Sequence, residues 1–275
     1  RRFYYRTGSL MSPTLQKSFS TAWMQYSNDW NPLHYDVTYA ASSGHQNTIV
    51  HGILPYLEGF NRMIGSGNWP MAEPLTIIGK FQRPLPHDQD LQWHTDDRGL
   101  FKILRLMSSE QTYVTLRANH HESPGFELQP GEETIQVIPL EEVWQKMERS
   151  VHYVGQDWLN LTRGVAAVFT LTVRQALPLY YQLPPHLRSL GLSGREVGDL
   201  LHIQQKVSIA PSIHLTEAAQ GFLILTRIRA EASYLGEVQS YFARVIQGDS
   251  IKAFIQSDFI KLEKSHDKLN NIFVS

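Results

Sequence analysis

Three side chains that can take part in proton transfer lie within six residues of one another near the start of the chain. They are the carboxylate of Asp29, the amide of Asn31 and the imidazole of His34, in the run Asp-Trp-Asn-Pro-Leu-His. A histidine titrates near neutral pH, and a carboxylate beside it fixes its tautomer or shares the proton transfer. Two such groups on either side of a water molecule activate its oxygen and deliver a proton to carbon. This is the chemistry of adding water to a double bond or removing it.

Pro32 restricts the shape of this segment. Its ring fixes φ at about −65° and pushes the preceding residue, Asn31, towards an extended conformation. The segment therefore cannot be a regular helix, and we expect a bent loop that directs Asp29 and His34 into one cleft. We expect Asn31 to orient the water or to tether the loop. A plain turn is the alternative interpretation, because Asp, Asn and Pro are all common turn residues.

A second feature is the pair His51-Gly52, which directly precedes a stretch with helical periodicity. The apolar positions of that stretch are Ile53, Leu57, Phe60 and Ile64. A helix N-terminus presents backbone N–H groups and the positive end of the helix dipole, and glycine lets another atom approach the backbone closely. A thioester carbonyl placed there would have its developing enolate charge stabilised. For His51 alone, a purely structural histidine is the alternative interpretation.

Composition excludes several classes of protein. The 25 Lys and Arg residues nearly balance the 26 Asp and Glu residues, so we expect no nucleic-acid partner. The chain contains no cysteine, which removes disulfides, thiolate metal sites and a cysteine nucleophile. The most apolar run, residues 164–173, is too short for a membrane span, which needs about twenty residues. The histidines without ligand-like partners at a recognised metal spacing are His87, His94, His202 and His214.

The same order of elements is expected twice along the chain. In the first half, a helix at 53–64 precedes strands expected at 75–83, 90–95, 101–107 and 112–119. In the second half, a helical stretch at 157–181 precedes strands expected at 200–210, 221–233, 238–247 and 251–260. A segment rich in Gly, Pro and Glu, at 123–131, begins the linker region. This repetition indicates two α+β units, which we place at residues 1–130 and 131–275.

The motif region resembles the MaoC-like, or type 2, enoyl-thioester hydratase/dehydratase family. The matching residues are Asp29, Asn31, Pro32, Leu33, His34, Asp36, Tyr39, Ala40 and Ile49-Val50-His51-Gly52-Ile53. The segment 79–85 is similar to the first strand after the helix in that family, and the whole match covers roughly residues 19–95. The resemblance implies an α+β, double hot-dog fold, in which two antiparallel sheets each wrap a long central helix.

The resemblance also implies a reaction and roles for individual residues. Asp29 and His34 would be the catalytic pair, with Asn31 as a helper and the backbone N–H of Gly52 on the thioester carbonyl. The residues expected to contact the substrate are His51, Ile53, Trp30 and Tyr35. The implied enzyme is a hydro-lyase that reversibly hydrates a trans-2-enoyl thioester to the (R)-3-hydroxyacyl thioester in fatty-acid or polyketide metabolism. It needs no metal or other cofactor, and its substrate is carried by coenzyme A or an acyl carrier protein.

The second half departs from the motif, since it has neither an Asp-x-Asn-Pro-x-His run nor a His-Gly pair before its helix. We expect a degenerate hot-dog repeat that supports the first half. Two alternatives stay open, an acyl thioesterase of the same fold and a non-catalytic acyl-binding or scaffold module of a synthase complex. The intact motif favours the hydratase. We expect a cytoplasmic protein, with the mitochondrion or another organelle left open, and we leave open a homodimer or a place in a larger synthase.

Overall fold

The structure is a computed structural model. It describes residues 16–27, 31–65, 74–97, 101–119, 134–138, 200–210, 222–233, 236–248 and 250–261. Two residues of the motif, Asp29 and Trp30, lie outside these ranges, as do the helix expected at 157–181 and the linker at 123–131.

The helices all lie in the first quarter of the chain among the described residues. They are α1 (Lys17–Ser27), the single 3-10 turn η2 (Pro32–His34), α2 (Val37–Ser42) and α3 (Ile53–Gly65). The helix expected at 53–64 is confirmed as α3. The sequence prediction missed α2, which begins because the Asp36 carboxylate accepts a hydrogen bond from the Tyr39 N–H at 3.0 Å.

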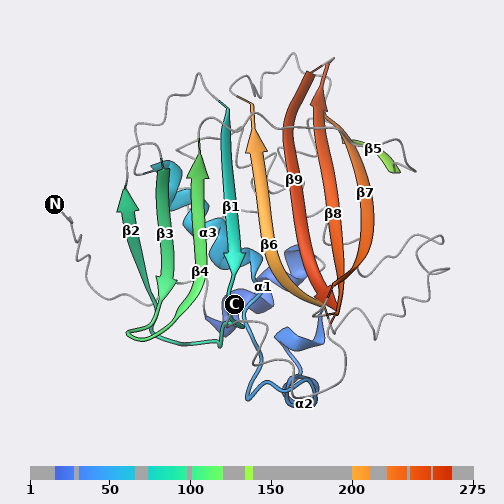
Figure 1. Ribbon diagram of the computed structural model, residues 1–275. Helices are drawn as coiled ribbons and strands as arrows, with labels where there is room; N and C mark the ends of the chain where they lie inside the picture. The colour runs from blue at the N-terminus through green and yellow to red at the C-terminus, as the bar shows by residue number, and fades with distance from the viewer. Residues whose placement is uncertain are drawn as a thin grey trace.

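The strands of the described residues form one antiparallel nine-stranded sheet in the order β2-β3-β4-β1-β6-β9-β8-β7-β5 (Figure 1). Their bounds are β1 Leu75–Phe81, β2 Gln92–Asp97, β3 Phe101–Met107, β4 Thr112–Asn119, β5 Thr134–Ile138, β6 Leu200–Ile209, β7 Phe222–Ser233, β8 Gly236–Gln247 and β9 Ser250–Lys261. All eight strands expected from the sequence are present. The ninth, β5, was not expected, and it lies at the end of the strand order, paired with β7.

The two groups of strands are joined edge to edge by β1 and β6. These strands pair antiparallel, from Leu75 opposite Ile209 to Lys80 opposite Gln204. Across the same junction the hydroxyl groups of Thr76 and Ser208 lie 2.8 Å apart in a buried hydrogen bond. The predicted α+β hot-dog architecture is confirmed, with the correction that the two expected sheets are one continuous sheet. Backbone pairing across the junction explains why, since it leaves neither β1 nor β6 as an open edge.

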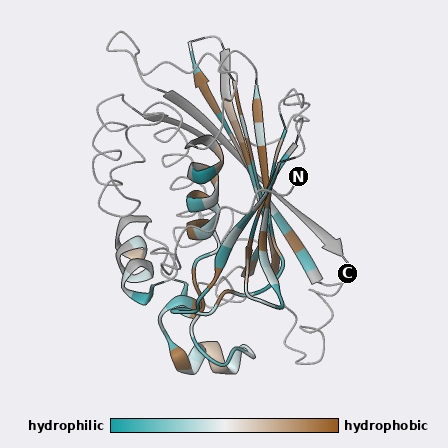
Figure 2. Cartoon of the chain, turned by 90° about the vertical axis from the view of Figure 1, so that its left-hand side faces the viewer, coloured by the Kyte–Doolittle hydropathy of each residue, from teal (hydrophilic) through white to brown (hydrophobic). Residues whose placement is uncertain are grey.

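Helix α3 lies against one face of the sheet, as the edge-on view in Figure 2 shows. It contacts β3 and β4 and also reaches β1, and its buried side chains include Leu54, Tyr56 and Leu57. The ring of Tyr56 lies directly over Gly79 of β1, where an added Cβ would come within 2.4 Å of it. The Tyr56 hydroxyl donates a hydrogen bond to the Ile77 carbonyl at 3.0 Å. A glycine at position 79 therefore lets the helix approach the sheet this closely.

Replacing Gly79 with alanine should lower the free energy of unfolding by about 1–3 kcal/mol, the usual effect of overpacking a dense core. The new methyl group would displace the Tyr56 ring and weaken its bond to Ile77. Urea unfolding measures the change. The Tyr56→Ala background is the control, because there the additional Gly79→Ala change should have a much smaller effect. Equal effects of Gly79→Ala in both backgrounds would contradict this explanation of the glycine.

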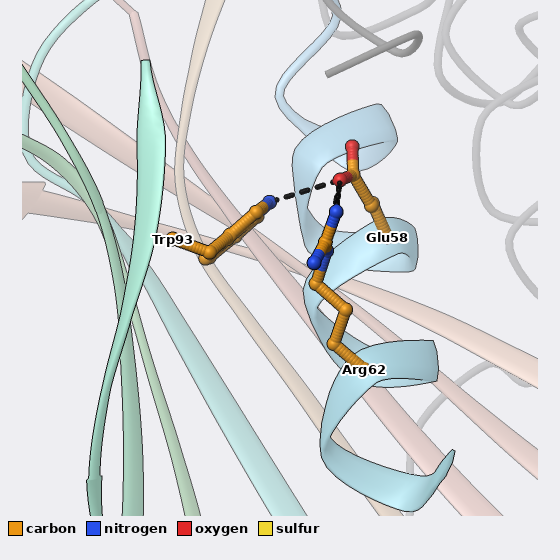
Figure 3. Close-up of polar contacts among 3 residues, drawn as sticks. All are labelled: Glu58, Arg62 and Trp93. Carbon is orange, nitrogen blue, oxygen red and sulfur yellow. Dashed lines mark hydrogen bonds and ion pairs between the residues drawn. The ribbon is translucent and has the colours of Figure 1, made fainter. Parts of the chain in front are cut away.

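A carboxylate on α3 ties the helix to the outer strand β2 (Figure 3). Glu58 Oε1 accepts hydrogen bonds from Trp93 Nε1 at 3.0 Å and from Arg62 Nε at 3.0 Å. The Arg62 guanidinium is half exposed, so its ion pair with Glu58 contributes little by itself. The Trp93 contact is charge-assisted and crosses from helix to sheet, which makes it the stronger constraint. It helps to fix α3, and with it the start of the helix at Gly52.

Candidate active site

Asn31 starts the 3-10 turn that carries His34. Its side-chain Oδ1 accepts a hydrogen bond from the Leu33 N–H at 3.1 Å, and its backbone carbonyl accepts one from the His34 N–H at 3.0 Å. Pro32 occupies the first position of the turn, where a missing N–H has no cost. Asn31 is buried. Of the two roles expected for Asn31, these contacts correspond to tethering the loop.

The imidazole of His34 is buried and oriented by a backbone carbonyl. Its Nδ1 lies 2.8 Å from the carbonyl oxygen of Ile49. Because a carbonyl oxygen only accepts hydrogen bonds, the proton of the neutral ring resides on Nδ1. The basic lone pair is then on Nε2, which is the arrangement a general base requires.

The structure brings the two parts of the sequence motif into contact. The rings of His34 and His51 are stacked, with their centroids 3.5 Å apart and their planes 26° from parallel. The His51 carbonyl accepts a hydrogen bond from the Leu54 N–H at 2.9 Å, which closes the first turn of α3. His51 is almost completely buried. The histidine of the loop therefore lies against the start of the helix at which a thioester carbonyl was expected.

Gly52 precedes α3 and makes room for a histidine from the second half of the chain. An added Cβ at Gly52 would lie 3.3 Å from Nδ1 of His202, on β6, and 3.4 Å from the ring of Phe81. The sequence offered no role for His202, because 150 residues separate it from Gly52. The pairing of β1 with β6 and the contact of His202 with Phe81 at the end of β1 bring the two together.

The His202 side chain next to Gly52 is uncharged. Its ring lies between Phe81 and Phe259, with centroid distances of 4.3 Å and 4.5 Å. Burial lowers the pKa of His202 to about 3, although its contact with the Gln204 carbonyl acts in the opposite direction. Its Nε2 lies 3.0 Å from that carbonyl and so carries the proton of the neutral ring. The second half therefore places a neutral imidazole beside Gly52.

An apolar cluster fastens the motif loop to strands of the second half. Leu33 and Ile49, from the loop region, are buried together with Leu201 of β6 and Ile260 of β9. Tyr39 and Ile203 pack against the same cluster, whose four core side chains are each less than a tenth exposed. The position of His34, which follows Leu33 directly, thus depends on contacts with β6 and β9.

The remaining residues expected at the site differ in their surroundings. Ile53 is buried at the start of α3, whereas Tyr35 is 45% exposed. The structure therefore gathers Asn31, His34, His51 and Gly52 with Ile53 beside them, and it leaves the Tyr35 side chain at the surface. Asp29 and Trp30 lie outside the described residues.

Within the described ranges, no three His, Cys, Asp or Glu side chains are grouped so that they could hold a metal ion. In the same part of the chain, no helix has the length and apolar character to cross a membrane.

Comparison with known proteins agrees with the motif. No family model matches the chain. Over 93 residues the chain is 30% identical to the mitochondrial 3-hydroxyacyl-[acyl-carrier-protein] dehydratase of Arabidopsis thaliana, a stretch that covers 34% of this chain and 51% of that protein. The chain thus spans about half the length of that curated relative.

A solved structure named MaoC-like dehydratase superposes on nearly the whole chain. The TM-score is 0.52 over 94% of this chain and 99% of the other, at 8% sequence identity. At this identity the likeness shows the fold alone. By its fold the chain belongs to the hot-dog class. Within that class, the arrangement of its strands and helices is similar to that of the solved structure named MaoC-like dehydratase.

Proposed function

We propose that the protein reversibly hydrates a trans-2-enoyl thioester to the (R)-3-hydroxyacyl thioester, as a hydro-lyase. The observation that carries the proposal is the contact between His34 and His51 at the start of α3. It places a histidine with its proton on Nδ1 beside the backbone of Gly52. The dehydratase names of the sequence relative and of the structural neighbour support the same chemistry.

The reaction requires two proton transfers and the stabilisation of an enolate. In the dehydration direction, a base removes a proton from C2, and the electron pair moves onto the thioester carbonyl oxygen. In this proposal the N–H of Gly52, at the helix start, stabilises that charge. The enolate then reforms the carbonyl as the C3 hydroxyl receives a proton and leaves as water. Asp29 and His34 divide these two transfers between them.

We assign the site to residues 1–130 and propose that residues 131–275 form a degenerate hot-dog repeat that supports it. Two observations support this division. The first strand after the linker, β5, pairs with β7 of the second group, and the side chains of Leu201 and Ile260 hold the motif loop. His202 adds a contact at Gly52 from the same half.

The carrier, the assembly and the compartment are further parts of the proposal. The Arabidopsis relative is named for acyl-carrier-protein thioesters, which supports a carrier-protein substrate beside a coenzyme A one. For the assembly, the proposal is that the protein forms a homodimer or is part of a larger synthase. The name of the same relative places that protein in mitochondria, which supports an organelle as the alternative to the cytoplasm.

The test uses purified protein with crotonyl-CoA and, separately, with the crotonyl thioester of a carrier protein. Absorbance of the conjugated enoyl thioester reports hydration, and a thiol reagent reports release of the carrier. The proposal predicts a fall in absorbance with no thiol released. Release of thiol would instead indicate a thioesterase. No change in either signal with both carriers would contradict an enzyme and favour an acyl-binding module.

A further inference from the structure

His87, in the loop after β1, joins three segments of the chain near the site. Its Nε2 lies 2.9 Å from the hydroxyl of Ser20 on α1. Its Nδ1 lies 3.1 Å from the Thr48 hydroxyl and 3.2 Å from the Thr48 carbonyl. Because the carbonyl only accepts, Nδ1 carries the proton, and Nε2 accepts the hydrogen bond of Ser20. A neutral imidazole thus bonds to Thr48 through Nδ1 and to Ser20 through Nε2.

The neutral form of His87 is the one present at neutral pH. Burial is the main cause that lowers the pKa of His87 to about 4, and the nearby His34 lowers it further. Lys17 acts in the same direction, while Asp88 and the hydrogen bond to the Thr48 backbone oppose the shift. A protonated ring could not accept the hydrogen bond of Ser20. The distances and the neutral state both indicate that His87 donates to Thr48 and accepts from Ser20.

Thr48 begins a short segment, residues 48–50, which we call the 48–50 strap. Its other contacts are the Ile49 N–H to the Leu33 carbonyl at 3.0 Å, the Val50 N–H to the Leu85 carbonyl at 2.7 Å, and a β-bridge between Ile49 and Pro86. The strap also provides the Ile49 carbonyl, which accepts the Nδ1 proton of His34. A group that holds Thr48 therefore holds the acceptor that determines which nitrogen of His34 is basic.

We propose that His87 is a positioning residue of the active site. By holding the 48–50 strap, it keeps the Ile49 carbonyl on His34 Nδ1 and so keeps the basic lone pair on Nε2. This inference rests on the proposed role of His34 in hydration. His87 itself makes no contact with the substrate in this proposal and acts through Thr48 and Ile49.

The kinetic test compares His87→Leu with His87→Gln. The leucine removes both contacts, and kcat should fall about tenfold to a hundredfold with KM little changed, since small misplacements of catalytic groups have effects of this size. Glutamine can donate to Thr48 and accept from Ser20, so it should restore most of the rate. The matched control is His94→Gln on the exposed surface of β2, which should leave kcat unchanged.

A spectroscopic readout separates this inference from the proposed function. In protein labelled with ¹⁵N-histidine, the ring nitrogen shifts report the tautomer of His34 even if the protein has no hydratase activity. We expect the Nδ1–H form in the parent and in His87→Gln, and a mixture of tautomers in His87→Leu. Should His87→Leu fail to fold, Ser20→Ala tests the same link and should shift the tautomer partially. An unchanged His34 tautomer in a folded His87→Leu or Ser20→Ala protein would overturn the inference.

Discussion

Replacing His34 with alanine should lower kcat on an enoyl thioester by at least about a hundredfold, the lower range for loss of a general acid–base group. The reason is local. The His34 ring is the one whose Nδ1 is held by the Ile49 carbonyl and whose face lies 3.5 Å from His51, beside the start of α3. Removing it deletes the proposed acid–base group without touching the backbone N–H of Gly52. The absorbance assay with the enoyl thioester measures the loss.

The control for this variant is His94→Ala, because His94 is an exposed histidine on β2. It should keep the full rate. Circular dichroism and thermal unfolding should show that His34→Ala retains the fold, since the strands of the sheet do not depend on this ring. A folded His34→Ala protein with the parent rate would contradict the assignment of His34 as a catalytic residue.

Replacing Gly52 with valine should lower kcat by about 10²–10³, the effect of losing one donor of an oxyanion hole. The backbone N–H is still present in this variant. A Cβ at this position would meet His202 Nδ1 at 3.3 Å and Phe81 at 3.4 Å, and the two methyl groups of valine add to this crowding, so either the rings or the backbone at Gly52 must move. A backbone shift would displace the N–H from the position proposed for the thioester carbonyl oxygen. Single-turnover kinetics separate this loss from weaker substrate binding.

The matched experiment uses Gly52→Ala alone and together with His202→Ala. If crowding displaces the N–H, removal of the His202 ring should restore part of the rate that Gly52→Ala loses. If the alanine methyl group instead obstructs the substrate, the double variant should be as slow as Gly52→Ala. An unchanged rate in a folded Gly52→Val protein would contradict the role of this backbone group.

Periodicity and turn residues predicted most of the elements of the fold. The stripe from Ile53 to Ile64 became α3, and the alternating segments became eight strands of the sheet. The bend forced by Pro32 was also expected, and it appears as the 3-10 turn that carries His34. These features depend on neighbours within a few residues, which is why a single sequence reveals them.

The features that the sequence did not reveal depend on contacts between distant segments. The joining of β1 to β6 depends on strand pairing across more than a hundred residues, and strand alternation alone does not choose the partner. His202 and His87 gave no motif, since their roles follow from the packing around Gly52 and Thr48. The five-residue strand β5 is too short for its periodicity to stand out.

The most direct test of the proposed hydration is the absorbance of a crotonyl thioester with the parent protein beside the Asp29→Asn variant. Asparagine keeps the size of the side chain and removes the carboxylate that we propose transfers a proton. We predict that absorbance falls with the parent, and at least about a hundredfold more slowly with the variant, the range expected for an acid–base group. Equal rates would contradict the pairing of Asp29 with His34, and an inactive parent with either carrier would contradict the hydration itself.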